Sequence, residues 1–356
     1  MKKIMSHKVT MQHIADAVGV SKYVVSKSLS GKEGVNAATR ERVRQAAIKM
    51  GYRFNPRVVK VGEDESDGAT GLVQTIVVLL PNISYQFKDS LYWGRIVDGI
   101  TQELESLDLK GVVVTDQTAD SFLSIVNRDT IQGFIGVGEV SSQVIEEISR
   151  LRVPIVLVDS GNPLIEAIRL FSNNKECVYQ LSQHLLSLNH RKIRFVGNVN
   201  YSQSFMSRWT GYKDAMEEHG LPVDRQDPLC HLKGDDRAEF TEEIRMILQE
   251  CCNNSELPTA LVCANDSIAI SAMRALSDLK LEVPGDISVT GFDNIEDAYH
   301  TTPGLTTVNV EKEIIGRRAV QLMLHSIKHS DFPKETVYIP ASIIHRESVS
   351  AYKGKM

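Results

Sequence analysis

From Thr75 onward, short runs of β-branched and other apolar residues alternate with longer amphipathic stretches. Such alternation predicts β-α-β units, in which crossover helices join parallel strands. The apolar runs occupy residues 75–80, 112–115, 134–137, 155–159, 193–198, 260–266 and 287–293. Seven strands with their helices exceed one compact sheet for a segment of this length. We therefore predict a body, residues 75–356, built from two doubly wound parallel-sheet subdomains that face one another across a cleft.

Polar residues that follow these runs mark the expected ligand site, because ligands of open α/β sheets bind beyond the carboxyl ends of the strands. They are Asn82, Asp159, Asn198, Asn265, Asp266, Asp293 and Asn294. Carboxylates and amides suit hydroxyl-rich ligands, since their atoms accept from or donate to each hydroxyl. The alternative is that these residues only cap the helices that follow, and Asp266 fits that alternative best.

Charge is distributed unevenly along the chain. Residues 1–62 hold 13 lysines and arginines against 3 acidic residues, whereas the remaining residues hold 27 against 42. A basic head on an acidic body indicates a polyanionic partner for the head, nucleic acid before membrane. A solvated basic face without a partner is the alternative.

Residues 10–50 contain three short helical patterns, and each is preceded by a residue that can cap exposed backbone N–H groups. These candidate caps are Thr10, Ser21 and Asn36. Gly19 supplies the turn between the first two patterns, and Gly51 ends the third. Two short helices about a glycine turn are typical of a helix-turn-helix unit, here residues 1–54.

The second of these helices has a packing face and a polar face. At 100° per residue, the polar face presents Lys22, Tyr23, Ser26 and Lys27. Lysine side chains reach guanine acceptors or phosphates, and a tyrosine reaches a base edge or a thymine methyl. We predict that this helix reads the major groove; a small three-helix protein-binding module is the alternative.

A hinge and a linker follow the head. Residues 55–62 begin like a helix with Pro56 at the first position, but the segment is short and rich in β-branched residues, so it is marginal in isolation. Residues 63–74 are rich in glycine and acidic residues without apolar periodicity, which predicts a flexible linker.

Residues 9–56 closely resemble the DNA-binding head of the lactose repressor (LacI/GalR) family of bacterial regulators, through VTMQHIADAVGVSKYVVSKSLSG and the residues that follow. The resemblance implies that Lys22, Tyr23 and Lys27 face the bases. It also implies a hinge that becomes helical on DNA, with a wedge in the minor groove. The wedge position is Val61, and Arg57 and Lys60 of the same hinge are further DNA-contact candidates. One departure is Val24, where the family usually has a threonine.

The resemblance extends through the body, in LNHRKIRFVGN (188–198), RWTGY (208–212), ALVCANDSIAI (260–270), VPGDISVTGFDN (283–294) and PGLTTVNVEKEIIGRRAVQLML (303–324). It implies a periplasmic-binding-protein-like body with effector residues Phe87, Asp159, Arg208, Asn265 and Asp293. Many relatives have a ligand-stacking aromatic residue where this chain has Asp236. We expect one subdomain to comprise about 75–170 and 303–332, and the other about 171–302 and 333–350.

Other classes are disfavoured by the sequence. It has no nucleophile motif, P-loop or metal-ligand cluster, and His184 and His190 are expected on helix surfaces, so an enzyme is not expected. The five cysteines lack CxxC spacing, so no metal, cofactor or redox role is expected. A transporter's solute-binding protein shares the body but lacks the head and needs a signal peptide. Without a signal peptide or membrane span, we expect a cytoplasmic protein, associated with the nucleoid when bound to DNA.

The sequence therefore predicts a transcription regulator, and the family resemblance implies that it is a repressor. The predicted partners are double-stranded operator DNA and a small sugar-like effector in the cleft. Dimerisation through the body is expected, because paired heads then read the two half-sites of a pseudo-palindrome.

Overall fold

The computed structural model describes residues 11–29, 36, 39, 42–43, 59–60, 75–80, 91–114, 130–161, 165–329, 331 and 333–354. The chain forms two compact units, Met1–Val59 and Lys60–Met356. The boundary falls within residues 55–62, which the sequence assigns to a hinge, at the two-residue strand β1 (Val59–Lys60). No helix in the described ranges is long and apolar enough to cross a lipid bilayer.

The small unit contains the predicted helix-turn-helix. Helices α1 (Met11–Val18) and α2 (Lys22–Leu29) flank Gly19, whose φ of 72° is a conformation that glycine adopts without strain. Ser21 Oγ accepts a hydrogen bond from Val24 N at 3.2 Å, which confirms the predicted cap. The apolar sides of the two helices meet in a core formed by Ile14, Ala15, Val18, Val25 and Val43.

The third helical pattern of the head is described only in part. Asn36 Oδ1 accepts from Thr39 N at 2.7 Å, as expected of its predicted N-cap, and Arg42 and Val43 are helical. Arg42 Nη2 donates to Val18 O at 2.9 Å, so this segment is joined to the end of α1 by a hydrogen bond as well as by the buried Val43.

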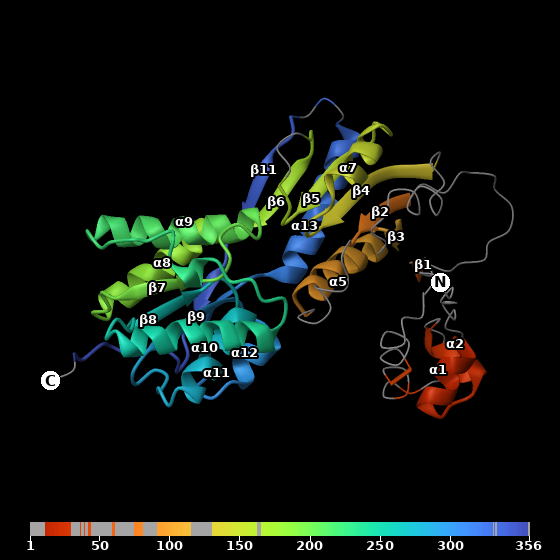
Figure 1. The fold of residues 1–356 in the computed structure, drawn as a ribbon. Helices are drawn as coiled ribbons and strands as arrows, with labels where there is room; N and C mark the ends of the chain where they lie inside the picture. Colours follow the sequence, from red (N-terminus) through yellow and green to blue (C-terminus); the bar gives the residue numbers. More distant parts are fainter. Residues whose placement is uncertain are drawn as a thin grey trace, which may run out of the picture. The chain divides into compact units, whose positions relative to one another are not determined.

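Six strands of the first lobe of the large unit run parallel to one another, in the order β3-β2-β4-β5-β6-β11 (Figure 1). They are β2 (Thr75–Leu79), β3 (Lys110–Val114), β4 (Ile131–Val137), β5 (Ile155–Val158), β6 (Ile168–Ser172) and β11 (Thr336–Ile339). Alternate residues of β2 bury on opposite faces, Ile76 and Val78 against helices α5 (Leu91–Ser106) and α13 (Lys312–Lys328), and Val77 and Leu79 against α7 (Ser142–Ser149). Both faces are covered, as parallel sheets require.

The second lobe has strand order β12-β10-β9-β8-β7, parallel except for β12, which is antiparallel to β10. Its strands are β7 (Ile193–Val196), β8 (Ala260–Cys263), β9 (Ser288–Asp293), β10 (Thr306–Asn309) and β12 (Ser342–Ile344). Helices α8 (Asn174–Ser187) and α9 (Gln203–Glu218) lie on one side of this sheet (Figure 1). On the other lie α10 (Arg237–Asn253) and α11 (Asp266–Asp278), and the short segments η2 (Pro228–Cys230) and α12 (Glu296–His300) complete the lobe.

The predicted fold class is confirmed, but the chain crosses between the lobes later than expected. It crosses after β6, after β10 and after β11. The expectation that residues 303–332 belong to the first subdomain and 333–350 to the second is therefore wrong for β10 and β11. These strands and β6 are four or five residues long, and β10 (TTVN) and β11 (TVYI) lack the long apolar runs by which the other strands were recognised.

His190 is buried in the second lobe with an exposed fraction of 2%, so its expected place on a helix surface is wrong. Its Nδ1 lies 3.0 Å from Thr259 Oγ1 and its Nε2 lies 2.9 Å from Ser350 O. The ring thus joins the start of β8 to the C-terminal segment. Burial lowers its pKa, which keeps the neutral ring favoured.

Helices α5 and α13 approach closely because a glycine of each helix faces the backbone of the other. A Cβ added at Gly316 of α13 would lie 2.1 Å from Ile96 O, and one added at Gly99 of α5 would lie 2.3 Å from Glu313 O. Neither contact can be relieved by rotating a side chain, since the opposing atoms are backbone. The packing of the two helices therefore depends on both glycines.

We predict that Gly316→Ala lowers the free energy of unfolding by about 1–3 kcal/mol, the usual cost of overpacking. The matched control is Gly94→Ala on α5, where an added Cβ meets nothing within 4 Å. Removing a helical glycine at that site should raise stability by up to about 1 kcal/mol. Urea unfolding of the two variants measures both effects, and equal stability would contradict the close approach of these helices.

Candidate functional site

The head exposes the face of α2 that the sequence predicts. Tyr23 has an exposed fraction of 68%, Lys22 is exposed, and Lys27 Nζ lies 5.4 Å from the centre of the Tyr23 ring. A large aromatic ring on an exposed helix face, flanked by two cations, can contact base edges and phosphates together. Ser21 and Asn36 cap helices rather than extend from this face.

The structure does not describe every residue that the sequence predicts to contact DNA. Thr10, Arg57 and Val61 lie outside the described residues. Ser26 is in α2 and Lys60 in β1, but nothing is described of their side chains. Of the predicted effector residues, Phe87 also lies outside the described residues.

Arg208 is the central residue of a buried polar cluster at the carboxyl-end edge of the second sheet. Only 3% of it is exposed. Its Nε donates to Asn174 Oδ1 at 2.8 Å, its Nη1 to Ala264 O at 2.6 Å and its Nη2 to Asp293 Oδ1 at 3.4 Å. The guanidinium lies 3.8 Å from the centre of the Phe292 ring. Desolvation of the cation is thus offset by hydrogen bonds, an ion pair and an aromatic face.

Asp159 brings a carboxylate from the first lobe to this cluster. It follows β5 in the left-handed conformation with φ 55°, and it accepts a hydrogen bond from Ser204 Oγ on α9 of the second lobe. Burial raises the pKa of Asp159, although the Arg208 cation and the Ser204 hydroxyl act in the opposite direction. The contact joins the end of β5 in the first lobe to the first turn of α9 in the second.

Two more groups of the first lobe contribute to the same junction. Tyr92 of α5 is buried, and burial together with the negative charges of Asp159 and Asp293 raises the pKa of its phenol well above the usual value. The phenol is therefore neutral and able to donate a hydrogen bond. Ser160, next to Asp159, is also buried, and among the described residues its hydroxyl has no hydrogen-bond partner. A buried hydroxyl of this kind keeps its capacity to pair with a polar ligand or water.

Lys312, at the start of α13, fastens one of the crossings between the lobes. Its buried ammonium donates to the carbonyls of Asp293, Asn294 and Val310. Asp293 and Asn294 both have positive φ, 108° and 48°, so the chain turns sharply at the end of β9. Burial lowers the pKa of Lys312, while the Asp293 and Asp266 carboxylates act in the opposite direction. The ammonium therefore joins the turn after β9 to the residue that follows β10.

The helix cap that the sequence assigned to Asp266 is made by its neighbour Asn265, which was predicted as an effector residue. Asn265 Oδ1 caps α11 by accepting from Ile268 N at 2.9 Å, and its neighbour Ala264 contacts Arg208. Asp266 is not a cap, because it is fully buried, contacts Thr307 Oγ1 at 2.5 Å and accepts from Ile295 N at 2.9 Å. Burial raises the pKa of Asp266 to about 8, and the nearby Asp293 charge acts in the same direction.

Asp236, at the position where the family resemblance implies an aromatic residue, has a structural role in this chain. Its Oδ1 accepts from Ala238 N at 2.9 Å and Glu239 N at 3.0 Å, which caps α10. A carboxylate at a helix N-terminus is favourable for both hydrogen bonding and the helix dipole. The residue stabilises the start of α10.

The structure thus brings together Asp159, Arg208 and Asp293. Asn265 is the next residue after Ala264, whose carbonyl accepts a hydrogen bond from Arg208. Sequence reasoning missed four further members of the cluster, Tyr92, Asn174, Ser204 and Lys312. Ser204 and Arg208 are one helical turn apart on α9, a spacing that would have placed both on one face. Tyr92 and Lys312 carried no comparable signal, because they reach the site only through the crossing of the two lobes.

Comparison with known proteins agrees with both units. Residues 10–55 match the family of bacterial regulatory proteins of the lacI type, and residues 182–349 match the periplasmic binding protein-like domain. The HTH-type transcriptional regulator AscG of Escherichia coli is 28% identical over 354 residues, which cover 96% of this chain and 98% of AscG.

Solved structures show the same fold. A complex of the transcriptional regulator CelR with cellobiose has a TM-score of 0.69 at 21% identity, covering 96% of this chain and all of that chain. The lac repressor dimer bound to operator and the anti-inducer ONPF has a TM-score of 0.65 at 21% identity, covering 97% of this chain and all of that chain.

A helix-turn-helix joined to a two-lobed body of the periplasmic-binding-protein type is the architecture of a DNA-binding transcription regulator and not of an enzyme. The head match also sets the chain apart from solute-binding proteins, which share the body alone. In both units the chain is similar to the lacI family of bacterial regulatory proteins, since residues 10–55 match that family directly and the regulator AscG matches over nearly the whole chain.

The buried Asp266 generates a prediction about pH. The folded carboxyl stays protonated up to about pH 8, whereas an unfolded aspartate ionises near pH 4. Between these values the folded state binds the extra proton, so the contribution of Asp266 to stability is lost as pH rises. Asp266→Asn keeps an acceptor for Ile295 N and a donor for Thr307 Oγ1 without titrating.

Urea unfolding from about pH 5 to about pH 8 should therefore show a smaller loss of stability in Asp266→Asn than in the wild type. The exposed Asp278→Asn variant is the control and should follow the wild-type profile. Parallel profiles for Asp266→Asn and the wild type would mean that Asp266 ionises normally.

Proposed function

We propose that this protein is a sequence-specific DNA-binding repressor whose operator affinity is modulated by a small, sugar-like effector held between the two lobes. The observation that carries the proposal is the buried cluster of Arg208, Asp159 and Asp293 at the ends of the strands, in a chain that also bears a helix-turn-helix head. DNA recognition and effector recognition thus have separate sites in one chain.

In the head, Lys22, Tyr23 and Lys27 contact bases in the major groove. The exposure of the α2 face and the closeness of Lys27 to the Tyr23 ring support this assignment. Contacts to the DNA sugar-phosphate backbone position the head but do not read the base sequence. We assign this role to Thr10, Ser21, Asn36 and the hinge residues. Val61 is the side chain assigned to the minor groove.

In the body, carboxylate and amide groups bind the effector's hydroxyls. Asp159 and Asp293 accept hydrogen bonds from them, the Tyr92 phenol and Asn265 amide donate, and Phe87 contributes an apolar wall. Buried, oriented groups of both kinds suit a polyhydroxylated ligand. Support comes from the neighbour solved as a complex with cellobiose, although that ligand belongs to the neighbour.

The two sites communicate through a dimer formed by the body. Effector binding closes the lobes on one another, and this alters the spacing of the paired hinges; couplings of about 1–3 kcal/mol are typical. The neighbour solved as a dimer on its operator supports this arrangement. Sedimentation at micromolar concentration tests it, and a monomer with full operator affinity would contradict it.

For DNA, we predict that Lys22→Ala and Tyr23→Ala each relax the preference at a base position by about 1–3 kcal/mol, because they remove direct base contacts. Arg57→Ala should instead weaken binding to all sequences and lower the salt slope by about one. Competition binding on a randomised operator library at several salt concentrations measures both effects.

The matched control for these charge changes is Lys175→Ala, an exposed lysine on α8 of the body. It removes one positive charge outside the head and should leave preference and salt slope unchanged. Equal losses on every sequence for Lys22→Ala, Tyr23→Ala and Arg57→Ala would contradict the division of roles.

For the effector, a thermal-shift screen of sugars, sugar phosphates and nucleosides should give a ligand that raises the unfolding midpoint. Asp159→Asn should then lose most of that shift, since it removes a charge but keeps an acceptor for Ser204 Oγ. Its operator affinity without effector should stay near wild type. Asp278→Asn is the control, and an unchanged shift in Asp159→Asn would exclude Asp159 from the site. Arg208→Ala is a poorer probe, because it leaves the buried Asp293 and Asn174 without their partner.

A further inference from the structure

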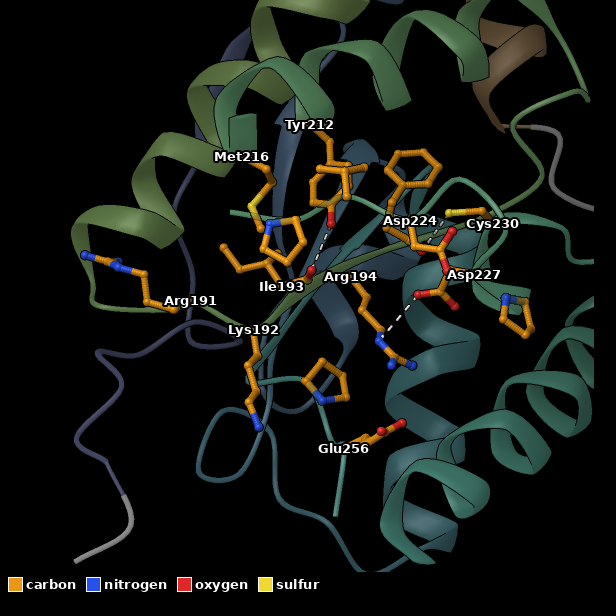
Figure 2. Close-up of a pocket in the computed structure, with 15 residues that line it drawn as sticks. Arg191, Lys192, Ile193, Arg194, Tyr212, Met216, Asp224, Asp227, Cys230 and Glu256 are labelled. Carbon is orange, nitrogen blue, oxygen red and sulfur yellow. Dashed lines mark hydrogen bonds and ion pairs between the residues drawn. The ribbon is translucent and has the colours of Figure 1, made fainter. Parts of the chain in front are cut away.

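A cavity of about 540 Å³ lies in the second lobe, at the opposite edge of the sheet from Arg208. It is bounded by the first residues of β7, the inner face of α9, the segment 222–228 and the segment 256–258 (Figure 2). Its size is in the range of small-molecule sites. None of the residues of the cluster between the lobes lines it.

The floor of this cavity is apolar. The side chains that form it are Ile193, Phe195, Tyr212, Met216, Pro222, Val223 and Pro258. The one polar group of the floor, the Tyr212 hydroxyl, is already engaged, since it donates to Ile193 O at 2.8 Å. The floor therefore offers apolar contact and leaves polar recognition to the rim.

Two cationic side chains at the rim have weak partners or none among the described residues. Arg194 makes an ion pair with Asp227 Oδ2 at 3.4 Å, and in the described part of the chain its guanidinium hydrogen bond is to Cys251 Sγ at 3.0 Å, a weak acceptor. Lys192 precedes it by two residues, and its ammonium has no partner among the described side chains. Arg191 differs, because it donates to Leu186 O and His190 O and so caps α8.

Acidic residues balance these cations. Glu256 is exposed at the same end of the cavity as Lys192 and Arg194 (Figure 2), and it has no side-chain partner in the described ranges. Asp227 is already paired with Arg194, and Asp224 lies near Asp227 (Figure 2). A simple anion gains from the cations but is repelled by three carboxylates. The rim is complementary to a ligand that carries both charges.

We propose that this cavity binds an α-amino acid with an apolar side chain. Arg194 and Lys192 bind its carboxylate, Glu256 binds its ammonium, and the side chain packs on the floor against Val223 and Met216. Arginine presents paired N–H donors that match a carboxylate. The site is separate from the effector site proposed above and does not depend on it.

Helix α9 connects this cavity to the cluster between the lobes. Ser204, Arg208, Tyr212 and Met216 follow one another at four-residue intervals, so they form one stripe along the helix. The first two belong to the cluster between the lobes and the last two line the cavity. A ligand in the cavity thus contacts the same rigid element that positions Arg208.

The test is isothermal titration of the full chain with L-leucine and two analogues that each lack one charge. The carboxylate-only analogue is 4-methylpentanoate and the amine-only analogue is 3-methylbutylamine. Leucine should bind saturably at millimolar concentration or below, and each analogue should bind at least about tenfold more weakly, because one charge-assisted hydrogen bond is lost. Absence of saturable leucine binding, or equal binding of either analogue, would overturn the proposal.

Variants identify the site. Lys192→Gln and Glu256→Gln change exposed residues and should each weaken leucine binding by about tenfold. Lys175→Gln and Glu250→Gln carry the same charge changes elsewhere on the second lobe and should bind as wild type. Asp159→Asn should also bind leucine normally. Loss of leucine binding in Asp159→Asn alone would place the amino acid between the lobes and overturn the assignment.

Discussion

The buried guanidinium of Arg208 organises the edge of the second lobe that faces the first. A cation that is almost fully removed from water is tolerated only if its donors are matched, and each of its partners comes from a different element. Asn174 begins α8, Ala264 follows β8, and Asp293 ends β9. One side chain therefore fixes the relative positions of three segments at the ends of the strands. The carboxylate of Asp159 meets this arrangement from the other lobe through Ser204.

The crossings between the lobes depend on the same group of residues. Asp293 faces Arg208 with its carboxylate and Lys312 with its carbonyl, so it belongs to the cluster and to the turn at once. Lys312 begins α13, and α13 is packed on α5 of the first lobe through facing glycines. A continuous series of short contacts thus leads from the polar cluster into the first lobe. Movement of one lobe against the other would therefore act on the contacts of Lys312 with this turn.

Much of this was accessible from the sequence, and the limits have physical causes. The head was predictable because capping residues, a glycine turn and amphipathic spacing are local signals, and Ser21 and Asn36 cap as expected. The long apolar strands were found for the same reason. Residues such as Asp159, Arg208 and Asp293 were found because strand ends converge in parallel sheets and because a family resemblance identified them. Asp266 was misassigned, since its partners Thr307 and Ile295 lie on segments that only the folded sheet brings near. The crossings were misplaced because β10 (TTVN) and β11 (TVYI) lack the continuous apolar runs that marked the other strands.

The stripe on α9 has a consequence for how this lobe can vary. Residues four apart stay aligned only while the helix keeps its register, and each residue advances the helix by about 100°. Deletion of one residue between Arg208 and Tyr212 would turn everything beyond it away from its present face. Either Ser204 and Arg208 would keep their partners while Tyr212 and Met216 left the cavity floor, or Tyr212 and Met216 would stay while Ser204 and Arg208 lost their partners. The length of this helical segment is therefore fixed by two separated surfaces at once, so a single-residue insertion or deletion there must disrupt one of them.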